Sequence, residues 1–392
     1  MSDDPESGVK TKISKNELER RWAAVRHAMK EEGLDFLIMT NVTDILGGYV
    51  KWFTDMSANN NYPFTVIFPR DDEITIIRHG PRGVTKPDIH GIKKQIGVPD
   101  LPSLGFSSTF EAEMAVEELS KHGNCRIGLV GLSFIWAAFY NHLTGHLDTA
   151  DFIDATDLVD SIKAIKSEEE IQHIRHLCAL QDTTFEQTLT FIKPGRRDFE
   201  IYADIMHQCL LTGSSQANIM VGSGPLGEPK APPGLRDRYR EIREGDLVEV
   251  LIESNGPSGF FAEILGTFCL GEVPAELQEH FEIAQEAQKR TLKLLKPGAD
   301  PMTIWDANNE FLKSVGYEEE RRLLIHGMGY DMVEKPSVQI GETMKIQAGM
   351  NIAAHATATS GKWGGAVCEN YLVKESGEAE CLHRTTQKIY RL

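Results

Sequence analysis

The sequence predicts a two-domain protein, with an α/β domain followed by an α+β domain. Its 392 residues are more than one hydrophobic core usually organises, which favours two domains. In the first half, short apolar runs alternate with helical patterns, an order typical of α/β structure. In the second half, two pairs of helical segments each precede a group of strand-like segments, which indicates helices packed on antiparallel sheet. We place a flexible tail at 1–12, the first domain at 13–160 and the second at 161–392.

The first domain is predicted from a helix and a set of short strands. Residues 14–33 have a helical pattern, with Ser14 and Glu17 spaced as a capping box and Gly33 at the end. DFLIMT and CRIGLVG are short apolar runs typical of buried strands, and a helical segment follows the second. TVIF and EITIIR, separated by PRDD, indicate a hairpin.

The second domain opens on Ser167, whose spacing to Glu170 predicts a capping box and a helix to about Ile192. Further helices are predicted at 198–213, 274–295 and 303–316, and the polar segment between VGSGP and REGD is predicted to be a loop at a cleft. The strands are expected in DLVEVLIES, GFFAEILGTFCLG, LLIHGMG, MNIAAHATAT and GAVCENYLVKE.

Composition excludes several classes of function. The formal net charge of −17 argues against a nucleic-acid or anionic-membrane surface, which needs clustered Lys and Arg. No run of about 18 apolar residues is present, so no membrane span is expected, and the polar N-terminus is unlike a signal peptide. Six scattered cysteines without a CxxC favour free thiols and a cytoplasmic location.

The motifs of the second half resemble the creatinase, prolidase and aminopeptidase P family, which has the pita-bread fold. IKSEEEIQHIR is similar to its opening helix, and KPGRRDFEI and LKPGADPMTIW to its two Pro-Gly helix starts. REGDLVEV, GFFAEILGTFCLG, HGMGYD, GMNIAAHA and GAVCENYLV follow in the family's order over about 160–376. The resemblance implies a pita-bread domain after a smaller creatinase-like domain, and a homodimer.

The resemblance also implies a metal site that this chain alters. Metal-dependent members of the family bind two ions through two Asp, one His and two Glu. The corresponding positions here are Leu251, with Glu253 two residues on and on the same face of the strand, then Glu263, His326, His355 and Glu369. The following Ser254-Asn255-Gly256 leaves open that Glu253 already lies in a turn.

Two interpretations of these residues remain open. In the first, Glu263, His326, His355 and Glu369 hold a single Zn, Mn or Fe ion, for which imidazole and carboxylate are suitable ligands. In the second, which we favour from the sequence, no metal is bound, as in creatinase. The two histidines then perform general acid–base catalysis, and Glu263 and Glu369 orient them.

The predicted substrate is a small polar molecule other than creatine. The loop SGPLGEPKAPPG lacks the histidine that creatinase uses, and Leu265 and His355 replace its two guanidinium-binding glutamates. Tyr62 replaces an arginine that binds the substrate carboxylate. We predict that Tyr62, Trp52, Glu253 and Asp331 contact the substrate.

The resulting hypothesis is a hydrolase that cleaves a C–N bond of a small polar metabolite by His/Glu chemistry. The alternatives are an Xaa-Pro-peptidase-like hydrolase with a mononuclear metal site, a lyase, and a non-catalytic binding protein. The retained ionisable groups, Glu263, His326, His355 and Glu369, argue against the last.

Overall fold

The computed structural model describes residues 10–42, 46–58, 62–101, 103–227 and 239–392. These residues form two compact units, one spanning Lys12–Lys163 and the other Ala164–Leu392. Thr11 belongs with the second unit, where its N–H donates to the carbonyl of Pro257 at 3.0 Å. The predicted tail as far as residue 9, and residues 228–238 of the predicted loop, lie outside the described residues.

The first unit is a seven-stranded mixed sheet with helices on it, in the strand order β4-β5-β3-β2-β1-β6-β7. The predicted hairpin is present, since β2 and β3 pair antiparallel. The strands are β1 (Phe36–Asn41), β2 (Phe64–Pro69), β3 (Ile74–His79), β4 (Gly83–Thr85), β5 (Ile92–Val98), β6 (Arg126–Leu129) and β7 (Asp151–Asp154). The helices are α1 (Lys15–Glu31), α2 (Tyr49–Thr54), α3 (Phe110–Leu119), α4 (Ala137–His146) and α5 (Thr156–Lys163).

The second unit repeats one order of elements, two helices and then a sheet. Helices α6 (Glu168–Phe191) and α7 (Asp198–Leu211) precede β8 (Ala217–Pro225), β9 (Asp246–Asn255) and β10 (Phe261–Cys269). Helices α8 (Ala275–Leu294) and α9 (Pro301–Ser314) precede β11 (Ile325–Gly327), β12 (Glu334–Val338), β13 (Asn351–Ser360), β14 (Trp363–Val373) and β15 (Ala379–Cys381). The chain then returns, so that β16 (Ile389–Arg391) pairs with β10.

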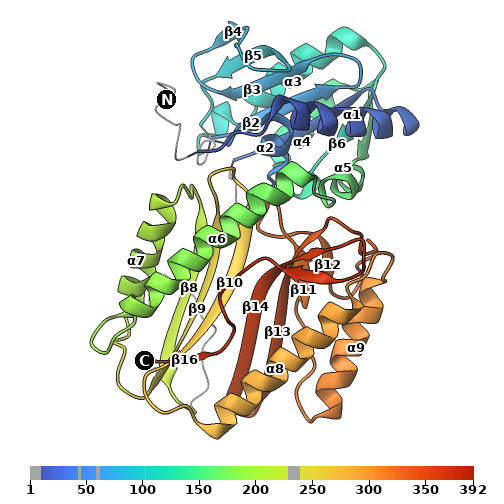
Figure 1. Cartoon of the computed structure of the whole chain (residues 1–392). Coiled ribbons are helices and arrows are strands. Elements are labelled where there is room, and N and C mark those ends of the chain that lie inside the picture. The colour runs from blue at the N-terminus through green and yellow to red at the C-terminus, as the bar shows by residue number, and fades with distance from the viewer. Residues whose placement is uncertain (1–9, 43–45, 59–61, 102, 228–238) are drawn as a thin grey trace. The chain divides into compact units, whose positions relative to one another are not determined.

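Two sheets result, in the orders β16-β10-β9-β8 and β12-β11-β13-β14-β15. They meet where β10 lies against β14, while α6 packs on β10 and α8 packs on β13 and β14 (Figure 1). The helices cover the outer faces because their apolar sides bury against the sheets, with Phe185 of α6 and Phe281 of α8 in the core.

Local chemistry explains the start of α6 and the closeness of α8. The predicted capping box forms, because the Ser167 hydroxyl accepts from the Glu170 N–H while the Glu170 carboxylate accepts from the Ser167 N–H. Gly365 allows β14 to approach α8, since a Cβ there would lie 2.5 Å from the backbone carbonyl of His280. These contacts fix the outer helices against the strands that carry the candidate site.

Two sequence predictions can be compared with the structure at this level. All six cysteines are free thiols. Within the described part of the chain, no helix combines the length and apolar character that crossing a bilayer requires.

Candidate functional site

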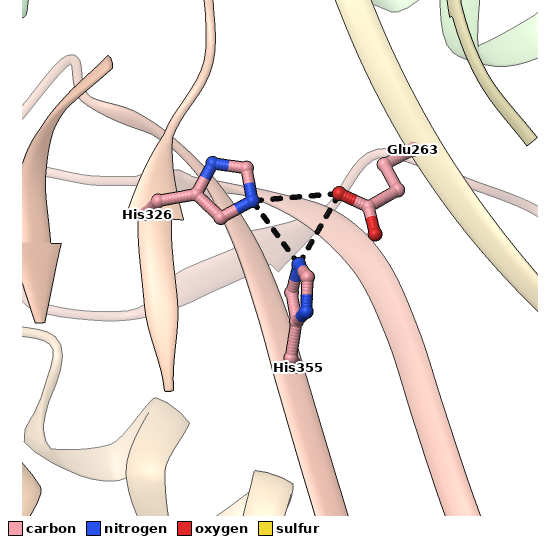
Figure 2. A group of neighbouring side chains, drawn as sticks. All are labelled: Glu263, His326 and His355. Atoms are coloured by element: carbon pink, nitrogen blue, oxygen red, sulfur yellow. Dashed lines mark hydrogen bonds and ion pairs between the residues drawn. The ribbon is translucent and has the colours of Figure 1, made fainter. Parts of the chain in front are cut away.

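Three side chains that the sequence predicted together converge in the second unit. Glu263 extends from near the start of β10, His326 from β11 and His355 from β13. Figure 2 shows the carboxylate and both imidazoles pointing toward one another. The Nε2 atoms of the histidines are 3.1 Å apart, and the Glu263 Oε2 lies 3.2 Å from Nε2 of His355 and 3.5 Å from Nε2 of His326.

These separations suit the ligands of one metal ion. Ligands about 2.0–2.1 Å from a tetrahedral Zn²⁺ lie about 3.3 Å from one another, and around an octahedral ion about 3.0 Å. The three donor atoms lie 3.1 to 3.5 Å from one another, which is closest to the tetrahedral value. Two imidazoles and one carboxylate are also ligand types that Zn and Fe accept.

The surroundings of His326 fix the tautomer of its imidazole. Its Nδ1 lies 2.9 Å from the carbonyl oxygen of Gly327, so Nδ1 carries the proton and donates it. In the neutral ring this leaves a lone pair on Nε2, which faces Glu263 and His355. A backbone carbonyl that fixes the tautomer of a histidine is a common support for metal ligands.

Charges within the group favour the ionised form of Glu263. Burial alone would raise the pKa of this carboxyl, but the neighbouring His355 and His326 outweigh burial and lower it. Burial alone would lower the pKa of His355, whereas the Glu263 carboxylate raises it. Without a metal, these two residues therefore form a partly buried ion pair, and a metal would displace the proton of His355.

Glu253 lies beside this group, inside a strand and not in a turn. In the pairing of β9 with β10 it is directly opposite Glu263, and its Oε2 accepts from the Nδ2 of Asn218 at 2.6 Å. Burial and the negative charge of Glu263 raise the pKa of Glu253. In the metal-free group, burial and the Glu263 charge therefore favour the neutral form of Glu253.

Two residues near the group were not predicted from the sequence. Cys368 of β14 lies directly opposite His355 in the strand pairing, and burial together with Glu263 raises the pKa of its thiol. Asn370, two residues on, accepts the Glu263 N–H at 2.6 Å and donates to Asn351 at 3.1 Å. The alternation of side chains along β14 was the signal that could have identified them.

The structure does not bring Glu369 to the other three. Because neighbours along a strand face opposite sides, placing Cys368 opposite His355 turns Glu369 to the other face of the sheet. There its Oε2 accepts from the Tyr371 hydroxyl at 2.7 Å. β14 is also an inner strand, flanked by β13 and β15, and Glu369 is buried.

Asp331 is placed in the buried turn that follows β11. Its N–H donates to the Glu334 Oε1 at 3.2 Å, and Glu334 forms a buried ion pair with Lys166 at 2.7 Å. Both side chains of this ion pair are at most 5% exposed. The ion pair therefore holds the backbone of the turn that follows Gly327.

Tyr62 and Trp52, predicted to contact substrate, belong to the first unit. Tyr62 is half-buried and stacks on His79, with ring centroids 4.1 Å apart. Trp52 is 1% exposed and packs between Phe53, at a ring centroid distance of 5.0 Å, and the Arg21 guanidinium. Burial leaves the Trp52 ring almost no surface for a substrate.

Comparison with known proteins places the residues of this group within a family. The family model for metallopeptidase family M24 matches residues 172–375, which is more than half of the chain. The chain belongs to metallopeptidase family M24. The matched segment contains Glu263, His326 and His355, and M24 enzymes normally bind divalent metals.

Curated M24 relatives include named dipeptidases. The chain is 28% identical over 207 residues to the probable dipeptidase PepE of Mycobacterium tuberculosis, covering 52% of the chain and 54% of that protein. It is 25% identical over 219 residues to the Xaa-Pro dipeptidase of Pyrococcus furiosus, covering 55% and 62%. The chain thus matches little more than half the length of these relatives.

Solved structures confirm the predicted fold of this M24 chain. The Xaa-Pro dipeptidase from Bacillus anthracis superposes with a TM-score of 0.77 at 18% identity, covering 96% of this chain and all of that one. The predicted pita-bread architecture, with an N-terminal and a C-terminal domain, is therefore correct.

Proposed function

We propose that this protein is a hydrolase that cleaves the C–N bond of a short peptide at a single-metal site made by Glu263, His326 and His355. The observation that carries the proposal is the convergence of their three donor atoms, which lie 3.1 to 3.5 Å apart. Membership of metallopeptidase family M24 supports the same class of reaction.

A divalent ion held by these residues would polarise the scissile carbonyl and lower the pKa of water. The protein supplies the remaining functions. Asn370 fixes the backbone of Glu263, and Gly327 fixes the tautomer of His326. His355, whose side chain is 21% exposed, is the member of the group that borders the open side, so we expect substrate to approach there.

One ion suits the described residues better than the two that the family resemblance implies. A second ion would need ionised oxygens from the neighbouring positions. The Glu253 Oε2 is already held by the Asn218 Nδ2 at 2.6 Å, and Glu369 faces the other side of β14. Among the described residues, the group able to hold an ion therefore has three members.

The proposed substrate class is a dipeptide or similar small peptide. The relatives PepE and the Xaa-Pro dipeptidases carry this activity in their names. A general acid–base hydrolase without metal is the second candidate, and the His355–Glu263 ion pair at 3.2 Å favours it. That pair is an imidazole oriented by a carboxylate, the arrangement that proton transfer near neutral pH requires.

Purified protein should release free amino acids from a dipeptide panel that includes Xaa-Pro members, measured by chromatography. We expect turnover in the wild type and its loss in Glu263→Gln, because the amide removes the negative donor. Glu244→Gln, an exposed carboxylate before β9, is the matched control and should keep full activity.

Failure of a correctly folded wild type to cleave any member of the panel would contradict the proposal. An alkene product in place of a free amine would instead assign the site to a lyase.

A further inference from the structure

A pocket lies on the face of β14 that points away from the candidate metal site. It has a volume of about 900 Å³, within the range of small-ligand sites. One face of α8 forms a wall, with residues at positions 285, 288, 289, 292 and 293, and position 296 just after the helix extends it. Glu369 and Tyr371 of β14 line it as well, and the turn 376–379 and Gln387 complete it.

Three lysines of the pocket provide positive charge. Lys289, Lys293 and Lys296 are exposed and recur along one face of α8 and the residues just after it. The ion pair that α8 forms joins Arg290 to Glu286, and none of the three lysines has a carboxylate partner in the part of the chain that the structure describes. In a protein of net charge −17, the three lysines form a local excess of positive charge on this wall, and Glu378 of the facing turn also lines the pocket.

The inner lining of the pocket is acidic and hydrogen-bonding. Glu369 is 5% exposed, and the Tyr371 hydroxyl donates to it at 2.7 Å and toward the Gln288 Oε1 at 3.4 Å. Burial raises the pKa of Glu369. The Tyr371 hydroxyl and the nearby His383 stabilise the ionised form of this carboxyl, and a ligand ammonium that reached it would add a charge-assisted hydrogen bond.

Contacts hold both sides of the pocket in place. The Gln285 Nε2 donates to the carbonyl of Gln387 at 3.0 Å, which ties α8 to the C-terminal segment. The turn at Gly377 packs on the stem of Lys296, since a Cβ on that glycine would lie 3.5 Å from the Lys296 Cγ. Gly377 has a φ of +79°, which a glycine adopts without strain.

We propose that this pocket binds a small zwitterion, such as a free amino acid or short peptide, with its carboxylate at Lys289, Lys293 and Lys296 and its ammonium at Glu369. The pairing of opposite charges at the rim and the inner wall selects a molecule that carries both. β14 connects the two sites, because Glu369 faces this pocket while the adjacent Cys368 faces His355. A ligand bound in this pocket would therefore contact β14, the same strand that lines the candidate active site.

Calorimetric titration of triglycine into His326→Ala protein tests the proposal. This variant is chosen so that hydrolysis does not contribute heat, and failure of the proposed function would leave the binding result unaffected. We expect triglycine to bind, and N-acetyl-triglycine and triglycine amide to bind at least about tenfold more weakly, because each lacks one of the two charges.

Variants added to the same protein locate the binding. Lys289→Ala with Lys293→Ala should weaken triglycine binding at least about tenfold, whereas Lys30→Ala, an exposed lysine of α1, should leave it unchanged. Glu369→Gln should weaken the binding of triglycine but not that of N-acetyl-triglycine, which has no free amine. Thermal melting checks that each variant is folded. Absence of binding, equal binding of the blocked peptides, or binding that survives the double lysine change would overturn the proposal.

Discussion

Replacing His355 by alanine is expected to lower kcat/KM for dipeptide hydrolysis about 10³-fold, in line with the loss of a positioned catalytic group. The imidazole contacts both other members of the group, at 3.1 Å from His326 and 3.2 Å from Glu263. Its removal leaves the fully buried Glu263 with one imidazole partner and takes away a donor atom of the proposed ion site. His326→Ala should have an effect of similar size.

Steady-state kinetics on purified variants measure this effect, with circular dichroism to confirm folding. His146→Ala is the matched control, because that histidine is exposed on α4 of the other unit. Activity of His355→Ala within about threefold of the wild type would contradict the role assigned to this group, since uncatalysed rates lie orders of magnitude lower.

Asp182→Ala is expected to lower the free energy of unfolding of the second unit by about 3 to 5 kcal/mol, the usual effect of breaking a buried ion pair. The Asp182 carboxylate on α6 accepts from the N–H groups of Arg384 and Thr385 at 2.9 and 3.0 Å. It also lies 3.5 Å from the Nδ1 of the fully buried His383. This one side chain fixes the C-terminal segment before β16 to α6.

Urea unfolding of the two proteins measures the loss. Asp204→Ala is the control, because the Asp204–Arg196 pair is partly exposed on both sides and should contribute about 1 kcal/mol or less. Equal losses in the two variants would show that Asp182 has no special role.

The same ion pair should make stability depend on alkaline pH. Burial would lower the pKa of His383, but Cys178 and Asp182 raise it to about 10. Because the pKa of His383 is raised in the folded state, the protonated imidazole stabilises the fold fully at pH values below about 6.5, its ordinary pKa. This contribution to the free energy of unfolding decreases as the pH rises toward 10. The stability advantage of the wild type over His383→Gln should shrink across that interval.

Much of the fold could be predicted because its signals are local. Capping at Ser167, the Pro-Gly helix starts and the apolar strand runs depend on neighbouring residues, and the structure contains these elements at nearly the expected bounds. The convergence of Glu263, His326 and His355 was predicted through the order of motifs, because no local pattern states which strands will be neighbours.

The orientation of β14 could not be read from the same motifs. A two-residue turn at Gly361-Lys362 pairs Ser360 with Trp363, and counting outward from this pair sets Cys368 opposite His355. A shift of one residue would have turned Glu369 to the site instead. The turn, where Gly361 has a φ of +61°, therefore decides which side chain completes the group.

Glu253 shows a related limit. The residues after it suggested a turn, but β9 continues to Asn255, whose side chain accepts from the N–H groups of Ser215 and Gln216. This long-range contact extends the strand and places Glu253 opposite Glu263. The rise in the pKa of Glu253 depends on burial and on that pairing, and sequence spacing reveals neither.

The most direct test of the single-ion site is the metal content of the purified protein, measured by inorganic mass spectrometry after growth with Zn, Mn and Fe. We expect one divalent ion per chain in the wild type, and loss of both the ion and the activity in His355→Ala and on chelation. Lys30→Ala should keep the ion. Two ions per chain, or full activity in protein that holds no metal, would contradict the site proposed here.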